Sequence, residues 1–177
     1  MKKNAVANLT RAAMFLAIGQ VLPFITGQIP EIGKMLCPMH FPVLLCGFFC
    51  GWKYGALVGF ICPLLRSVLF GMPVIYPNAV GMAFELLTYG LVSGLLAQKM
   101  GKDRLWKLYL TLITAMIAGR VVWGIAQVVL LGLSGAKFTF AAFIAGALTN
   151  AIPGIILQLI VIPLLVHAFE RRPAAGT

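Results

Sequence analysis

Acidic side chains are scarce in this chain, which has only four Asp and Glu residues among 177. Charged residues of both signs make up 10% of it, against about 25% in an average soluble domain. Hydrophobic residues supply 61% of the chain. So few charged groups exclude a soluble domain of any size and indicate an integral membrane protein.

The same scarcity argues against an enzyme embedded in the membrane. Catalysis by paired carboxylates, by a metal cluster or by a nucleophile with its base needs several ionisable groups close together. The four acids are Glu31, Glu85, Asp103 and Glu170. Only Glu85 falls inside an apolar run, and the two histidines, His40 and His167, lie far apart along the chain. We therefore expect no enzymatic activity, no metal site and no cofactor.

Two further classes of function are excluded by what is missing. The chain has no Gly-x-x-x-x-Gly-Lys-Ser/Thr loop to hold nucleotide phosphates, so it does not hydrolyse ATP itself. Its net charge of +10 does not indicate nucleic-acid binding, because the basic residues lie between apolar runs and form no continuous polar face.

Six apolar segments dominate the sequence, and a spanning helix needs about 20 residues. They cover roughly Leu9–Ile25, Met39–Cys50, Tyr54–Phe70, Asn78–Gln98, Leu108–Leu133 and Phe140–Phe169. The second is short for a span, and the sixth is long enough to tilt or to begin with a surface turn. No small-residue cleavage site follows the first, so we read it as a span and not as a signal peptide. The sequence predicts an all-α membrane protein, with residues 1–177 forming one domain of six transmembrane helices.

Basic residues are divided unevenly between the two sides that six spans define. Ten of the 14 fall on the side of the termini: Lys2, Lys3, Arg11, Lys53, Lys99, Lys102, Arg104, Lys107, Arg171 and Arg172. Lys34 and Lys137 fall on the other side, and Arg66 and Arg120 fall inside spans. Because basic loops stay cytoplasmic, we expect both termini in the cytoplasm.

This orientation gathers the intramembrane polar groups between the outer surface and mid-depth. The candidate binding residues are His40, Arg66, Asn78, Glu85, Tyr89, Arg120, Trp123 and Asn150. Ionisable groups inside a span are costly and usually face a cavity or a partner. We therefore expect a small-molecule pocket in the outer half, covered by two loops, Thr26–Pro38 and Gly71–Pro77, with Trp123 and Tyr76 over the apolar part of the ligand.

The number of charged residues inside the spans suggests the sign of the ligand's charge. If Glu85 pairs with one of the two intramembrane arginines, Arg66 or Arg120, the other arginine has no acidic partner. A buried charge without a partner is disfavoured, so an anionic group such as a carboxylate on the substrate is expected to supply it. The alternative is that either arginine caps backbone carbonyls or reaches a lipid headgroup.

Several short motifs give the pattern a family likeness. They are Ala13-xxx-Ala17, His40-Phe-Pro-Val-Leu-Leu-Cys-Gly, Pro63-Leu-Leu-Arg-Ser, Gly71-Met-Pro and Glu85-Leu-Leu-Thr-Tyr-Gly. Through them the chain resembles, over nearly its whole length, the S component of energy-coupling factor (ECF) vitamin transporters, which is their substrate-binding membrane subunit. The motifs look like the group with pantothenate-, folate-, hydroxymethylpyrimidine- and riboflavin-type members, without the Asp-rich outer loop of the riboflavin type.

The resemblance implies a six-helix S-component bundle in the bacterial plasma membrane that captures a vitamin with high affinity. It implies that Ala13 and Ala17 dock on a transmembrane coupling subunit, which works with two cytoplasmic ATPases. By spacing alone these alanines are equally compatible with packing inside the bundle. Pantothenate is the first expected substrate, and folate, hydroxymethylpyrimidine, pyridoxine or a queuosine-type compound are alternatives. A stand-alone secondary transporter is a further alternative, which would favour repeated halves and polar groups along the full membrane depth.

Overall fold

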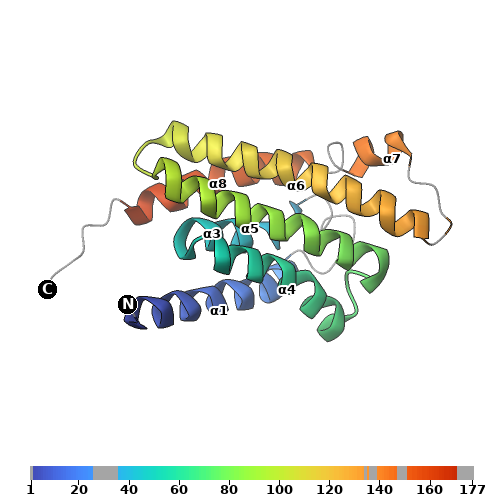
Figure 1. Ribbon diagram of the computed structural model, residues 1–177, viewed down its shortest axis with the longest axis horizontal. Coiled ribbons are helices and arrows are strands. Elements are labelled where there is room, and N and C mark those ends of the chain that lie inside the picture. Colours follow the sequence, from blue (N-terminus) through green and yellow to red (C-terminus); the bar gives the residue numbers. More distant parts are fainter. Residues whose placement is uncertain (1, 26–35, 134, 136–138, 147–150, 171–177) are drawn as a thin grey trace, which may run out of the picture.

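The computed structural model describes residues 2–25, 36–133, 135, 139–146 and 151–170, and its regular elements there are all helical. They are α1 (Lys2–Ile25), α3 (His40–Cys50), α4 (Trp52–Phe70), the π-helical turn η1 (Ile75–Ala79), α5 (Val80–Met100), α6 (Leu105–Leu133), α7 (Phe140–Ile144) and α8 (Ile152–Glu170). The long helices lie side by side along one axis (Figure 1). The all-α prediction is confirmed.

Five stretches of helix are long and apolar enough to cross a membrane, and α3 is a shorter apolar helix beside them. The five are Ala5–Phe24, Trp52–Phe70, Ile75–Met100, Leu105–Leu133 and Ile152–Phe169. Together with α3 they correspond to the six predicted segments, and α3 is the one expected to be short. The sixth segment, which was expected to tilt or to begin with a surface turn, contains two helices, α7 and α8. Pro153 lies in the first turn of α8, where its missing N–H and fixed φ suit a helix start and not a helix interior.

Basic side chains gather at one end of the bundle. α1 begins and α8 ends there, and the α3–α4 and α5–α6 turns lie at the same end (Figure 1). These turns and the helix starts after them carry Lys53, Lys102, Arg104 and Lys107. We call this the basic end; the opposite end holds the α4–η1 turn and α7 (Figure 1).

Glycines bring the backbones of α4 and α5 into contact. A Cβ atom on Gly90 would lie 2.1 Å from the carbonyl oxygen of Gly55, and one on Gly59 would lie 2.2 Å from the carbonyl oxygen of Leu86. Both distances are too short for any side chain, so these positions require glycine. Close backbone approach of this kind holds helices together in a bilayer, where lipid tails are as apolar as the helices themselves. The α4–α5 seam therefore fixes the helix that carries Glu85.

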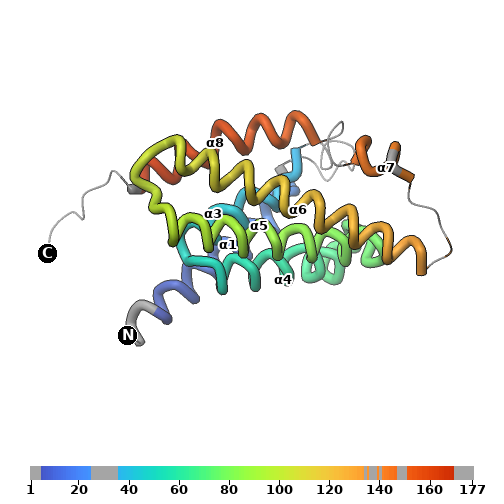
Figure 2. The backbone as a smooth tube through the Cα atoms, turned by 45° about the horizontal axis from the view of Figure 1, so that its top comes forward, coloured from blue at the N-terminus to red at the C-terminus, as the bar shows by residue number. Residues whose placement is uncertain are grey.

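The short helix α3 occupies an inner position. It packs against α1, α4, α5 and α8, and most of its side chains are buried. α1 and α8 lie on either side of it and have little direct contact with each other (Figure 2). His40, the first residue of α3, is thereby held inside the bundle, 3% exposed, next to α5.

Candidate functional site

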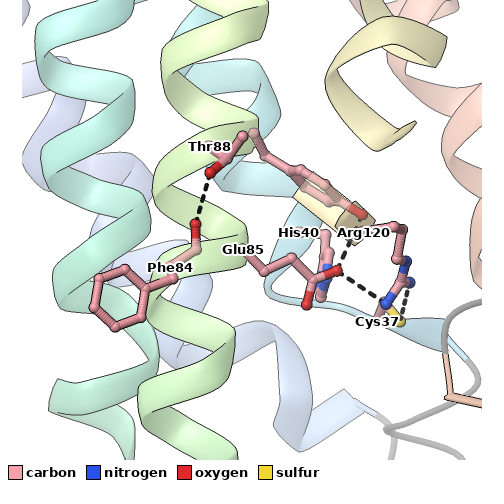
Figure 3. Close-up of polar contacts among 7 residues, drawn as sticks. Cys37, His40, Phe84, Glu85, Thr88 and Arg120 are labelled. Carbon is pink, nitrogen blue, oxygen red and sulfur yellow. Dashed lines mark hydrogen bonds and ion pairs between the residues drawn. The ribbon is translucent and has the colours of Figure 1, made fainter. Parts of the chain in front are cut away.

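The Glu85 carboxylate is the centre of a buried polar cluster. The Glu85 side chain is 2% exposed, and its Oε1 accepts an ion-pair contact from Arg120 Nη1 at 2.9 Å. The same oxygen lies 3.1 Å from the Tyr89 hydroxyl, which donates to it, and 3.4 Å from His40 Nε2. The cluster joins α3, α5 and α6, and Figure 3 shows the carboxylate pointing at the Arg120 guanidinium.

Local packing sets the position of Tyr89. It lies one helical turn after Glu85 on α5, and its ring occupies the space over Gly119 of α6, where a Cβ atom would be 2.0 Å from the ring. On its other side the ring packs edge-on against His40, with 5.2 Å between ring centroids. The hydroxyl is therefore held toward the Glu85 carboxylate by shape as well as by its hydrogen bond.

The cluster keeps unused hydrogen-bonding capacity. His40 Nδ1 and Arg120 Nε are buried and have no hydrogen-bond partner among the described residues. Buried polar atoms in native proteins are nearly always paired with protein or water, so such atoms call for an explanation. The Arg120 side chain is 14% exposed, which makes it more accessible than Glu85 or His40. Its Nη2 also lies 3.9 Å from the Cys37 sulfur (Figure 3).

The second intramembrane arginine has a different environment. Arg66 Nη1 donates to the Gln20 carbonyl oxygen at 2.6 Å, which ties α4 to α1. Its guanidinium lies 5.1 Å from the ring centroids of Phe24 and of Phe70. A carbonyl and two aromatic faces thus surround the charge of Arg66, as in the alternative stated above, and no acid contacts it among the described residues. Glu85 therefore pairs with Arg120, and Arg66 is not part of the Glu85 cluster.

The other predicted site residues differ in their contacts and exposure. Trp123 stacks on Phe143 of α7, with 6.2 Å between ring centroids. Asn78 is exposed in η1, and the Tyr76 hydroxyl donates to the Leu130 carbonyl. Asn150 and residues 26–35 of the first predicted loop lie outside the described residues.

Two buried residues near α5 and α6 were not among the predicted site residues. Gln127 is 5% exposed on α6, two turns beyond Arg120, and its amide lies against Gly81 of α5. Gln127 could have been identified from the sequence, because its amide lies within an apolar helix. Cys37 precedes α3 with a left-handed backbone, at φ 48°, and its place beside Arg120 is seen only in the folded chain.

Comparison with known proteins places the chain in a family. A family model described as "ECF transporter, substrate-specific component" matches residues 7–166. No curated protein and no solved structure gives a significant match. Such components are transporter subunits without enzymatic activity, and the apolar helices agree with a multi-pass membrane protein. The chain belongs to the family of substrate-specific components of ECF transporters.

Proposed function

We propose that this chain is the high-affinity capture subunit of an ATP-driven importer for a small anionic vitamin or vitamin precursor, with pantothenate as the first candidate. In this proposal the basic end faces the cytoplasm of a bacterial cell and both termini lie there. Substrate enters from the opposite end and is held between α3, α5 and α6.

The observation that carries the proposal is the Glu85–Arg120 pair, beside which Arg120 Nε and His40 Nδ1 have no hydrogen-bond partner in the described part of the chain. A guanidinium has five N–H donors, so the contact with Glu85 leaves donors for a second anion. Planar carboxylates are matched by this fork, which favours a carboxylate-bearing substrate over a neutral one. His40 Nδ1 adds one position for a hydroxyl or amide group of the same molecule.

Glu85 has a separate part in this proposal. Without a ligand, an isolated Arg120 would be a charge in a low-dielectric interior, which is strongly disfavoured. Glu85 neutralises it and holds it in one orientation through an ion pair that Tyr89 and His40 brace. The empty site can therefore exist between capture events, and the substrate finds a preorganised guanidinium.

Calorimetric titration of the purified chain with pantothenate, folate, hydroxymethylpyrimidine and pyridoxine tests this assignment. We expect the two carboxylate-bearing vitamins, pantothenate and folate, to bind more tightly than hydroxymethylpyrimidine and pyridoxine, with pantothenate first. Arg120→Gln should weaken its binding by about 2–5 kcal/mol, as expected for truncating one partner of a buried charge pair. Arg66→Gln, which leaves the Glu85 cluster intact, should bind within a few-fold of the parent. Equal affinity in both variants and the parent would end the anion assignment.

The exposed face of α1 supports docking on a coupling subunit. Ala13 and Ala17 are both exposed, whereas Ala12 and Gly19 on the same helix are buried against the bundle. We infer that Ala13 and Ala17 contact the coupling subunit of an ECF module and that its ATPases drive release. Cells that express this chain without such a module should bind the vitamin but not accumulate it, and accumulation would favour the secondary transporter instead.

A further inference from the structure

The inward face of α8 carries the amide of Gln158. This side chain is 1% exposed, and its Oε1 has no hydrogen-bond partner among the described residues. An unpaired buried acceptor is unfavourable, because the atom has lost its hydrogen bonds to water and has gained none from the protein. Buried polar atoms in native proteins are nearly always paired, so Gln158 Oε1 calls for a partner.

Gln158 belongs to the stripe of α8 that faces the other helices. Ile162 and Val166, four and eight residues later, are fully buried in the hydrophobic core, and Ile155 packs against the same core. Positions three and four residues apart share one face of a helix. Because α8 packs mainly on α3 and α6, the Gln158 side chain lies on the face that is turned toward these two helices.

The neighbours of Gln158 show which part of α3 lies beside it. Leu157 and Val161 of α8 line one groove together with Phe41 and Pro42 of α3. Phe41 and Pro42 lie in the first turn of α3. Gln158 is therefore at the level of this first turn along the bundle.

The first turn of α3 is also where the polar cluster meets α6. His40 Nε2 lies 3.4 Å from Glu85 Oε1, and the sulfur of Cys37, three residues earlier, lies 3.9 Å from Arg120 Nη2 (Figure 3). The start of α3 and Arg120 of α6 are thus at one level, and α8 presents Gln158 at the same level.

Three buried polar atoms at this level have no hydrogen-bond partner in the described part of the chain. They are His40 Nδ1 on α3, Arg120 Nε on α6 and Gln158 Oε1 on α8. Arg120 Nε is a donor, Gln158 Oε1 is an acceptor, and the role of His40 Nδ1 depends on its tautomer. A guest that carries both an acceptor and a donor group would satisfy this set, whereas an apolar guest would leave it unpaired.

We propose that Gln158 is a specificity-determining residue of the substrate site and that its Oε1 accepts a hydrogen bond from a hydroxyl or amide N–H of the substrate. This inference rests on the proposed function, since it takes the carboxylate of the same molecule to lie at Arg120. It adds α8 as a wall of the site and narrows the substrate class to carboxylates that also carry a neutral hydrogen-bond donor. A site built to bond such a group rejects analogues without it, because its own buried acceptor is then left unpaired.

Calorimetric titration of the parent and of Gln158→Met tests the selectivity. The probes are pantothenate, an analogue that lacks both hydroxyls, and an analogue with an ester oxygen in place of the amide N–H. In the parent, loss of the group that bonds Gln158 should weaken binding by about tenfold. In Gln158→Met the same change to the ligand should have no effect, because its partner is absent. Equal losses in parent and variant for both analogues would overturn the proposal.

The stability of the ligand-free chain separates this role from a structural one. Met is close to Gln in length and has no strong acceptor, so Gln158→Met removes an unpaired group from the interior. We expect its unfolding midpoint without ligand to equal or exceed that of the parent. A lower midpoint would show that the amide stabilises the fold through a partner in the chain, and the proposal would fail.

A further measurement applies to whatever small molecule the chain carries, and uses mass spectrometry of ligand extracted from each variant. Gln20→Met is the matched control, because Gln20 is another buried amide whose Oε1 has no partner among the described residues, but it lies on α1 and bonds the Cys62 carbonyl. We expect the ligand to be lost from Gln158→Met and kept by Gln20→Met.

Comparison with Arg120→Gln distinguishes this inference from the proposed function. Loss of the ligand from both Gln158→Met and Arg120→Gln would support both. Retention by Gln158→Met with loss from Arg120→Gln would overturn the role of Gln158 and leave the anion assignment intact. Loss from Gln158→Met with retention by Arg120→Gln would support the contact with Gln158 and overturn the anion assignment.

Discussion

At the scale of single residues, we propose that the Glu85–Arg120 ion pair serves both stability and binding, and substitutions can separate the two. Glu85→Gln removes the charge that faces Arg120 in the interior, and breaking a buried pair from one side costs about 3–5 kcal/mol. We expect a clear loss of thermal stability in detergent for Glu85→Gln. A second change, Arg120→Met in the same chain, should restore much of it, because the orphaned charge is then gone.

Ligand binding should respond differently to the same pair of changes. The double variant is expected to be folded and yet unable to bind the vitamin, because the guanidinium is absent. Thermal unfolding followed by tryptophan fluorescence, together with titration of the ligand, measures both quantities on one sample. A double variant that recovers stability and binds normally would show that the pair is purely structural.

The candidate binding residues predicted from the sequence include all four members of this cluster, Glu85, Tyr89, Arg120 and His40. Glu85, Arg120 and His40 were singled out because ionisable groups are costly inside apolar runs, and the structure brings all three together. Which arginine would pair with Glu85 was not predictable, since Arg66 and Arg120 both fall inside apolar spans and carry the same guanidinium group. The choice depends on the Gln20 carbonyl and on two rings, Phe24 and Phe70, that only the folded chain brings to Arg66.

At the scale of helices, the glycine seam between α4 and α5 positions the cluster. Gly90→Ala places a methyl group 2.1 Å from the Gly55 carbonyl oxygen, so the helices must separate. Overpacking of this kind costs about 1–3 kcal/mol, and we expect a corresponding fall in the unfolding midpoint. Gly132→Ala on α6 meets nothing within 4 Å and serves as the control, expected to be neutral or slightly stabilising. Equal effects at both positions would show that the seam is not tightly packed.

The exposed stripe of α1 gives a second prediction at this scale. Ala13→Trp or Ala17→Trp adds bulk to a lipid-accessible surface, so folding and ligand affinity should be unchanged. If the stripe contacts the coupling subunit, vitamin uptake by cells with a complete ECF module should be abolished. Ile117→Trp on α6 controls for a bulky exposed side chain. Normal uptake in both alanine variants would remove the assigned interface.

Helix existence was easier to predict than helix ends. Long apolar runs specify α1, α4, α5 and α6 almost directly, because a bilayer admits few other structures. A surface turn at the start of the last segment was allowed for, but the bounds of α7 and α8 were not predicted, since apolar composition continues across the segment and only Pro153 marks the start of α8. The place of α3 between α1 and α8 depends on tertiary packing, which hydropathy does not encode.

At the scale of the whole molecule, the orientation in the membrane is open to direct labelling. None of the four native cysteines forms a disulfide and all four are buried, so the parent chain should react little with an impermeant maleimide on intact cells. Val74→Cys, at the end opposite the basic end, should be labelled from outside. Lys53→Cys, at the basic end, should be labelled only after the cells are opened. The reverse pattern would place the basic end outside and contradict the expected topology.

The most direct test of the account is the identity of the small molecule that the purified chain carries. Mass spectrometry of ligand extracted from the parent, Arg66→Gln and Arg120→Gln proteins measures it. We expect a vitamin-like molecule with an acidic group, pantothenate first, which the parent and Arg66→Gln retain and Arg120→Gln loses. A retained molecule without an acidic group, or one that stays bound when Arg120 is replaced, would contradict the claim that the Glu85–Arg120 cluster receives the substrate.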